Sequence, residues 1–481
     1  MKIHLFIITL FCFLRLNVCY STAQSDFEVW LKQPVLHNAS VSILGIDAST
    51  GDTLFEKDAE RSLTPASVMK LFSTATALEM LGRDFKFKTE IAYSGSIDSQ
   101  GNLHGDIYIV GYGDPCLGAE RFAELYLKPV HFIDTWAKAI KDAGIKKVNG
   151  AIVGDPSAFC FPFQYGSWLY EDVGNYYAAP LSGLSIFENL YKLHFVTGFF
   201  DGDSTRLLGS EPEISGMTFT NKVVSATKGG DQSYIFGGAE CNHKIIKGSL
   251  PVKQSKFTIK GSIPNPPLYA AERLCDALTK ANISVGKPPR ALDEQEQRPP
   301  LKTIYTTWSP PLKRICDATN LWSLNLYADH LAIQCAVNQN KTAIEAGVVL
   351  LDFWKTKGMN TRGLKIVDGS GLSVFNTVNA GHLVYLLHYM KKKSALAEVF
   401  ETTLPVAGKS GTLSRYCVYG SGKERIKAKG GSMTGVRSMA GYANTKSNKQ
   451  IIFAVIINNY DESNGEIRKT LEDLLNMIAE M

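Results

Sequence analysis

A serine and a lysine three residues apart form the first candidate for chemistry in this chain. Ser67 and Lys70 lie in the run PASVMKLFSTATALEMLG, which begins at Pro65 and ends at Gly82. Positions i and i+3 share one face of a helix, so this lysine can accept the serine proton. Burial among apolar residues and the positive helix start both disfavour a charged lysine, and the same helix start favours negative charge on the Ser67 oxygen. The pattern predicts a serine nucleophile with a lysine base.

Ser-x-x-Lys is a weak motif by itself. The alternative interpretation of Ser67 is a helix cap, with Lys70 reaching out to solvent. A second copy, Ser225 and Lys228, runs into two glycines, where we expect a loop. Lys70 lies instead on a helix that is apolar nearly all round, and such a helix is typically buried.

A second candidate is Ser323-Leu324-Asn325 in the run NLWSLNLYADHL, which we expect at a junction between a loop and a helix. A serine and an amide two positions apart can point into one cleft, where Ser323 relays a proton and Asn325 holds a substrate carbonyl. A helix cap is the alternative interpretation.

The third candidate is Lys429-Gly430-Gly431-Ser432, which leads into an apolar strand. A lysine on an edge strand beside glycines offers positive charge where a substrate backbone can approach closely. Lys409-Ser410-Gly411 has a similar pattern but continues into a polar stretch, so we favour Lys429.

The elements around these residues predict a mixed α/β domain. Residues 41–47 and 53–55 form a hairpin, and a buried helix follows, with Pro65 just before it and Gly82 just after it. Strands at 435–443 and 451–457 precede a final helix. Between about 85 and 300 the chain changes to short strand-like runs, for example 107–110 and 151–153, which indicate inserted material. The Pro-rich, charged stretch 286–300 is typical of a linker.

We therefore expect a domain built from 25–84 and 301–481, interrupted by a mainly β insertion at 85–300. The 481 residues have room for two or three domains.

A net charge of +5 without a basic run gives no reason to expect nucleic-acid binding. The nine histidines form no zinc motif, and the spacing of the nine cysteines does not reveal their pairing.

The first 24 residues have the pattern of a secretory signal peptide. Lys2 precedes an apolar run of 3–14 that ends at Arg15, and small residues follow. This run is well short of the roughly 20 residues of a spanning helix, so we expect export to the periplasm or cell envelope. Lipidation of Cys19 is the alternative. Removal of this segment takes away Lys2 and Arg15, which leaves a charge of +3.

The ordered set Ser-x-x-Lys, Ser-x-Asn and Lys-x-Gly resembles the penicillin-recognising serine enzymes. The chain is most similar in pattern to D-alanyl-D-alanine carboxypeptidases of the penicillin-binding protein 4 type, which also cleave peptidoglycan cross-bridges. The resemblance covers nearly all of the chain after the signal peptide, through the runs PASVMK, GDPCL, VGDPSAF, APLSGLSIFEN, SPPL, SLNLYAD, DGSGLS, LPVAGKSGTL and AKGGSMTGVRSMAGY.

The resemblance implies a β-lactamase/transpeptidase-like fold, an antiparallel sheet with helices, and metal-free chemistry without a cofactor. Ser67 would be the acylated nucleophile and Lys70 its base, with Ser323 and Asn325 beside the cleft. Lys429 would meet the terminal carboxylate, and the N–H groups of Ser67 and Ser432 would form the oxyanion hole.

Three positions depart from the family pattern. Leu324 stands where an Asp is frequent, Ser410 where an Asp is usual, and Gly430 where a Thr is usual. Since Gly430 and Ser432 lie on one face of a strand, we expect Ser432 to supply part of the carboxylate contact. Asp155 is a candidate contact for a substrate amine, and its alternative is a structural Asp in the turn before Pro156.

The implied activity is hydrolysis of D-Ala-D-Ala ends and cross-links of peptidoglycan stem peptides, with β-lactams as covalent inhibitors. Two alternatives stay open. One is a sensor that binds muropeptides or β-lactams without turnover, which the complete set of polar groups disfavours. The other is a β-lactamase, which the large insertion disfavours.

Overall fold

The structure is a computed structural model that describes residues 26–126, 131–157, 159, 163–460 and 464–481. The predicted signal peptide, 1–24, lies outside these residues. The chain divides into two compact units, one formed by the residues up to 83 with 316–324 and 347–481, the other by 84–315 and 325–346. Within the part described, no helix has the length and apolar character needed to cross a membrane.

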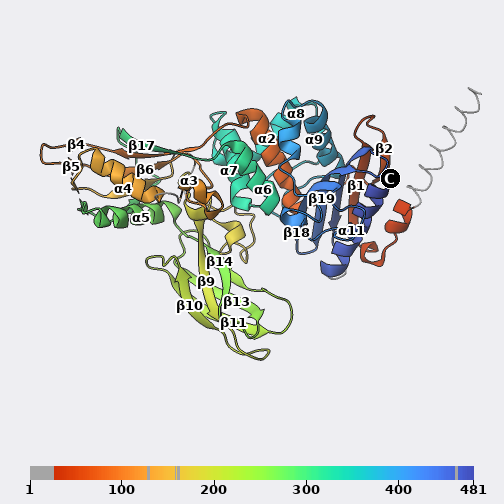
Figure 1. Cartoon of the computed structure of the whole chain (residues 1–481), viewed down its shortest axis with the longest axis horizontal. Helices are drawn as coiled ribbons and strands as arrows, with labels where there is room; N and C mark the ends of the chain where they lie inside the picture. The colour runs from red at the N-terminus through yellow and green to blue at the C-terminus, as the bar shows by residue number, and fades with distance from the viewer. Residues whose placement is uncertain (1–25, 127–130, 158, 160–162, 461–463) are drawn as a thin grey trace, which may run out of the picture. The chain divides into compact units, whose positions relative to one another are not determined.

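A five-stranded antiparallel sheet forms the centre of the first unit. Its strand order is β18 (Ile426–Met433), β19 (Val436–Asn444), β20 (Gln450–Asn458), β1 (Ser40–Asp47) and β2 (Thr53–Lys57). The predicted hairpin and the two predicted C-terminal strands are all present. Strand β18, which carries Lys429, is an edge strand, as expected (Figure 1).

Helices cover both faces of this sheet. Helix α11 (Asn464–Glu480) shares a hydrophobic core with alternate residues of β20: Ile451, Phe453, Val455 and Ile457. Helix α9 (Ala380–Lys392) also packs on β20 and on β1. A strand covered on both faces needs a continuous apolar run, and QIIFAVIIN is one. The remaining helical elements are η1 (Pro34–Leu36), η2 (Ala66–Met69), α2 (Lys70–Leu81), α8 (Ala346–Thr356), α10 (Ala397–Glu401), η7 (Gly411–Leu413) and α6 (Leu312–Trp322), which crosses the boundary between the units.

Four sheets and several helices build the second unit. The sheet orders are β16-β8-β6-β3-β17, β15-β7-β5-β4, β10-β9-β14 and β11-β13-β12. In chain order, the strands are β3 (Lys88–Tyr93), β4 (Ser96–Ile97), β5 (Asn102–His104), β6 (Ile107–Gly111), β7 (Lys147–Val148), β8 (Ile152–Asp155), β9 (Leu190–Val196), β10 (Arg206–Glu211), β11 (Thr218–Ala226), β12 (Tyr234–Phe236), β13 (His243–Pro251), β14 (Phe257–Ser262), β15 (Ser284–Val285), β16 (Arg290–Ala291) and β17 (Lys302–Trp308).

The helical elements of this unit are η3 (Glu120–Phe122), α3 (Ala123–Tyr126), α4 (Phe132–Asp142), η4 (Tyr176–Ala178), η5 (Phe187–Asn189), α5 (Pro266–Lys280), α7 (Asn325–Val337) and η6 (Ala343–Glu345). Helix α5 packs on β8 and against α4. Cys116, Cys241, Cys275, Cys335 and Cys417 are free thiols.

The predicted linker at 286–300 is wrong as a description of this segment. Arg290 and Ala291 form β16, which pairs in parallel with β8, and Leu292 is buried in the core beneath. Arg290 also holds Glu296 through two hydrogen bonds of 2.6 and 2.8 Å. Proline and charge predicted a solvated connection, but these contacts tie the segment to the sheet. The compact second unit also takes in 301–315 and 325–346, whereas the predicted insertion ends at 300.

A buried histidine lies at the centre of the second unit. His330 on α7 is fully buried, with Nδ1 at 3.0 Å from the Gly113 carbonyl oxygen and Nε2 at 3.4 Å from Ser185 Oγ. A carbonyl only accepts, so Nδ1 carries a proton. Burial lowers the pKa of His330 from 6.5 to about 4.

We expect His330 to make stability fall in acid. Its folded pKa lies below the unfolded value, so its contribution is present above pH 6.5 and is lost as the pH falls toward about 4. The loss amounts to about 3 kcal/mol. Urea unfolding at about pH 7 and about pH 4.5 measures it, with His330→Gln as the comparison. An equal pH dependence in the two proteins would contradict this assignment.

Candidate active site

Ser67 and Lys70 meet at the start of the buried helix. Lys70 Nζ lies 2.9 Å from Ser67 Oγ and donates to the Ser370 carbonyl oxygen at 2.6 Å. The first turn, η2, is a 3-10 turn that continues into α2, so both residues share the helix start. Lys70 is fully buried, whereas Ser67 is partly exposed. A hydroxyl accessible to substrate therefore lies beside a desolvated amine.

The backbone around Ser67 adopts unusual conformations. Ala66, which directly precedes it, is a buried non-glycine residue with φ of 49°. The preceding carbonyl, that of Pro65, accepts a hydrogen bond from Ser438 Oγ at 2.5 Å. Such a conformation costs about 1–3 kcal/mol and persists where the surroundings hold it. Here the contact with β19 holds the turn that exposes Ser67.

The loop that supports Lys70 is built by Asp368. Its buried carboxylate accepts hydrogen bonds from the N–H groups of Gly371 at 2.7 Å and Ser373 at 2.6 Å. Gly371 has φ of 82°, and a Cβ there would come within 2.0 Å of the Ala66 carbonyl oxygen. Sequence reasoning noted the run DGSGLS but missed that it presents the Ser370 carbonyl to Lys70.

Ser323 and Lys429 form a second serine–lysine pair. Lys429 Nζ donates to Ser323 Oγ at 2.9 Å and to the Gly430 carbonyl oxygen at 2.6 Å. Ser323 has φ of 58° at the junction of α6 and α7, and both helices are regular on either side. The predicted junction is thus present, although it joins two helices. Lys429 is fully buried, and burial together with the charge of Lys70 holds the pKa of Lys429 well below 10.5.

The open edge of β18 offers hydrogen-bond donors. The N–H of Ala428 points away from β19, because it donates to the Pro405 carbonyl oxygen at 3.1 Å. N–H directions alternate along a strand, so the N–H groups of Gly430 and Ser432 point to the same edge. This direction is compatible with the predicted contribution of Ser432 to an oxyanion hole.

Gly431 lets β18 approach the helix that carries Ser67. A Cβ at Gly431 would lie 2.3 Å from Ser438 Oγ and 2.8 Å from the Ser67 nitrogen. At Gly430 the nearest atom to such a Cβ, Met439 Cε, is 3.8 Å away. The two adjacent glycines therefore differ in the space beside them. A side chain fits at Gly430, whereas the close contact with Ser438 and Ser67 requires a glycine at 431.

We expect Gly431→Ala to slow acylation by a fluorescent penicillin about a hundredfold, because the added methyl pushes β18 away from the Ser67 nitrogen. The matched control Gly430→Ala should stay within about twofold of the unmodified protein. Similar rates for the two variants would show that this contact does not set the site geometry.

Arg437 is a site residue that sequence reasoning missed. It lies opposite Ser432 in the β18–β19 register, and its guanidinium donates to Ser432 Oγ. Ser432 is exposed and Arg437 is partly exposed. The antiparallel pairing of 429–432 with the following strand could have indicated this neighbour, since residues opposite each other share a face.

Two other predicted site residues belong to the second unit. Asn325 begins α7, and its amide nitrogen donates to the Tyr177 carbonyl oxygen at 2.8 Å. Asp155 ends β8 and is fully buried, with hydrogen bonds from the Ser157 nitrogen at 2.8 Å and from Arg298 at 3.3 Å. These contacts favour the turn interpretation of Asp155.

The competing copies of the motifs lie in different surroundings. Lys409 is exposed and pairs with Glu424 at 2.9 Å. Ser225 lies near the end of β11, whereas a loop was expected there. Its side chain is buried and accepts a hydrogen bond from the Gly198 nitrogen. Lys228 is exposed. No group of three or more His, Cys, Asp or Glu residues that could hold a metal ion occurs among residues 26–481 where they are described.

The family model for D-Ala-D-Ala carboxypeptidase 3 (S13) matches residues 23–478. The chain belongs to this family. The resemblance inferred from the three motifs is confirmed, and so is the expected class of enzyme.

Relatives and solved structures agree with this family. The chain is 28% identical over 442 residues to a D-alanyl-D-alanine carboxypeptidase of Actinomadura sp. (strain R39), covering 87% of this chain and 78% of the relative. It is 24% identical over 449 residues to the D-alanyl-D-alanine carboxypeptidase DacB of Haemophilus influenzae, covering 91% and 88%. The crystal structure of penicillin binding protein 4 from H. influenzae matches with a TM-score of 0.78 at 22% identity, covering 94% of this chain and 99% of that one. The expected fold is thereby confirmed.

Proposed function

We propose that this protein is a serine D-Ala-D-Ala carboxypeptidase and endopeptidase that acts on peptidoglycan through an acyl-enzyme on Ser67. The observation that carries the proposal is the 2.9 Å separation of Ser67 Oγ from the fully buried Lys70 amine. A desolvated amine at hydrogen-bond distance can take the hydroxyl proton as the oxygen attacks. The names of the family and of its relatives supply the substrate class.

The reaction has two steps. Ser67 Oγ attacks the carbonyl carbon of the penultimate D-alanine, and its proton passes to Lys70. The C–N bond then breaks, and that proton leaves with the amine nitrogen through the Ser323 hydroxyl. Water next attacks the acyl carbon and gives one proton to Lys70. The ester C–O bond then breaks, and Lys70 returns that proton to the Ser67 oxygen. N–H groups of Ser67 and Ser432 stabilise the oxyanion, each worth about 3–4 kcal/mol.

We expect intact mass to rise by one penicillin adduct in the unmodified protein and by none in Ser67→Ala. Ser67 is the hydroxyl beside the buried Lys70 amine, so its removal leaves no nucleophile there. Ser73→Ala, a serine of the same helix whose buried hydroxyl donates to the Gly369 carbonyl oxygen, is the control and should still be labelled. Equal labelling of Ser67→Ala and the unmodified protein would overturn the assignment.

The substrate carboxylate needs a cation, and Lys429 is poorly placed to be its sole partner. Its amine is fully buried and donates to two protein acceptors, and its pKa is lowered. Arg437 offers a planar guanidinium, which suits a carboxylate, and lies partly exposed beside the Ser432 hydroxyl. We therefore extend the proposal: Ser432 and Arg437 together bind the terminal carboxylate and replace the hydroxyl missing at Gly430.

Arg437→Ala and Ser432→Ala should each raise KM for a free-acid D-Ala-D-Ala peptide by about tenfold or more, as expected for charge-assisted bonds of about 1.5–3 kcal/mol. Acylation by an ester without a carboxylate should change little. Lys409→Ala, which removes an exposed lysine paired with Glu424, is the matched control. A loss of equal size on the ester and the free acid would refute the carboxylate role.

The remaining finer points belong to the same proposal. Mass analysis of cross-linked muropeptides after incubation separates endopeptidase from carboxypeptidase products, and no release of either would favour a sensor or a β-lactamase. Inhibition by β-lactams is expected, since a H. influenzae penicillin binding protein 4 of the same fold is described in complex with a β-lactam. Export through the segment 1–24 is the localisation that we propose.

A further inference from the structure

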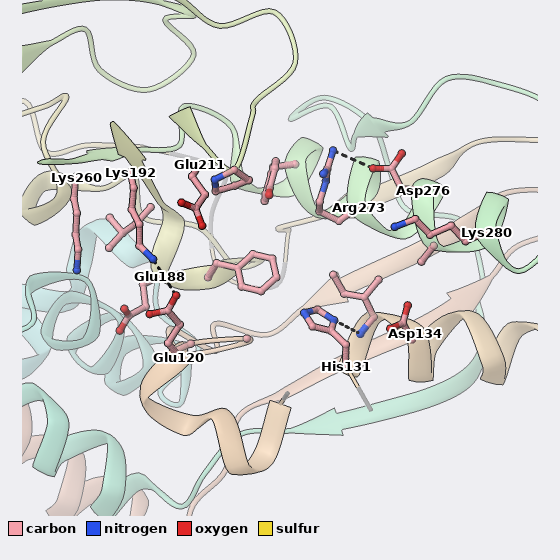
Figure 2. A pocket seen from close by; sticks show the side chains of 18 residues that line it. Glu120, His131, Asp134, Glu188, Lys192, Glu211, Lys260, Arg273, Asp276 and Lys280 are labelled. Atoms are coloured by element: carbon pink, nitrogen blue, oxygen red, sulfur yellow. Dashed lines mark hydrogen bonds and ion pairs between the residues drawn. The ribbon is translucent and has the colours of Figure 1, made fainter. Parts of the chain in front are cut away.

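A cavity of about 540 Å³ lies within the second unit, built entirely from that unit's residues. Its walls come from β9 and β14, from α5, and from the segments 118–120 and 131–134 (Figure 2). We call it the β9–α5 pocket. Its volume falls in the range of about 300–1,000 Å³ that ligand sites occupy. None of the serine–lysine residues described above lines it.

Two aromatic residues, Phe187 and Tyr269, help to line the β9–α5 pocket, and an unusual turn holds Phe187. Phe187, Glu188 and Asn189 have φ of 52°, 58° and 54°, three successive left-handed residues without a glycine. Asn189 is buried and donates to the Pro180 carbonyl oxygen and to Ser185 Oγ, both at 2.9 Å.

Glu188 accepts hydrogen bonds from Arg121 at 2.7 Å and Tyr327 at 2.8 Å, which fixes the turn from its other side. The turn holds the Phe187 ring with its centre 6.4 Å from the centre of the Tyr269 ring. This surface suits an aliphatic or planar part of a ligand. The turn belongs to the run APLSGLSIFEN, which the catalytic proposal does not use.

Charges of both signs line the walls. Figure 2 shows two groups on opposite sides of the pocket: Lys192, Lys260, Glu120 and Glu188 on one, and Arg273, Asp276, Lys280, Asp134 and His131 on the other. The pocket is lined by four basic side chains (Lys or Arg) and five acidic ones, so its positive and negative charges nearly cancel. A polyanion such as a nucleic acid would meet five carboxylates, so the pocket suits a ligand that carries both signs.

Several of these groups have unused binding capacity. Within the described residues, Lys192 pairs with Glu120 and Arg273 with Asp276, whereas Lys260, Lys280 and Asp134 are in no ion pair. The Arg273 Nε is buried and has no hydrogen-bond partner, and its guanidinium lies 5.0 Å from the Tyr269 ring. Lys260 and Lys280 are exposed, so their amines can meet the acceptor groups of a ligand in the pocket.

We propose that the β9–α5 pocket binds a peptidoglycan stem peptide as a second, noncatalytic site. This inference rests on the proposed function for the identity of the polymer. A stem peptide carries the free carboxylate of a γ-linked glutamate and the ammonium and carboxylate of a diamino acid. The carboxylates contact Arg273, Lys280 and Lys260, and the ammonium contacts Asp134. Because the polymer bears many stem peptides, a second site raises the local concentration of ends and cross-links near the enzyme.

The test uses full-length protein acylated with penicillin, so that the serine–lysine site is blocked. The probe is the tripeptide L-Ala-γ-D-Glu-diaminopimelate, which lacks D-alanine and so has no bond for Ser67 to cleave. Calorimetry should show one saturable binding event. The double variant Lys260→Glu with Lys280→Glu should weaken it by about tenfold or more. Lys228→Glu with Lys287→Glu, two exposed lysines outside the pocket, is the matched control and should bind normally.

The two proposals fail in different ways. Absence of the penicillin adduct in the mass spectrum would count against the catalytic proposal. With the adduct present, no saturable tripeptide binding, or the same loss in the control variant, would overturn the second site. In unblocked protein the pocket variant should raise KM for intact peptidoglycan and leave kinetics on a soluble D-Ala-D-Ala peptide unchanged, and equal losses on both substrates would also overturn it.

Discussion

Two fully buried lysines in one compact unit are the constraint on which the rest of the site depends. Each amine lies at hydrogen-bond distance from one serine hydroxyl and one backbone carbonyl: Lys70 from those of Ser67 and Ser370, and Lys429 from those of Ser323 and Gly430. For Lys429, burial and the charge of Lys70 both act against the charged form, and its pKa is lowered accordingly. A site of this kind keeps an amine ready to accept a proton.

Holding these groups together requires unusual backbone geometry. Ala66 and Ser323 have positive φ, and each lies at or next to a serine that meets a buried lysine. Gly371 and Gly431 let the supporting loop and the edge strand approach closer than any side chain would allow. The sheet, covered by helices on both faces, supplies the rigidity that maintains this strain. The stability of the first unit and the precision of the site therefore have a common origin.

The second unit shows how local composition can mislead. The segment 286–300 has the proline and charge of a linker, yet Arg290 and Leu292 tie it to a sheet. Asp155 has the type and position of a substrate contact, yet its carboxylate is buried against Arg298 and the following turn. The pairing of 290–291 with β8 and the contact between Asp155 and Arg298 join residues far apart in the chain, which composition does not reveal.

By itself, the sequence determined the helix that carries Ser67 and Lys70, the hairpin, the C-terminal strands and helix, and the nomination of Ser67 and Lys70 as candidates, because each is set by spacing within a short run. It also separated Lys429 from Lys409 through the apolar strand that follows. Only the tertiary structure decided that Ser370 holds Lys70, that Ser323 and Lys429 pair, that Arg437 stands beside Ser432, and that Gly431 matters where Gly430 does not. These facts join residues far apart in the chain; Lys70 and Ser370, for example, are 300 positions apart. Their physical reason is the packing of sheet, loop and helix, which no local pattern encodes.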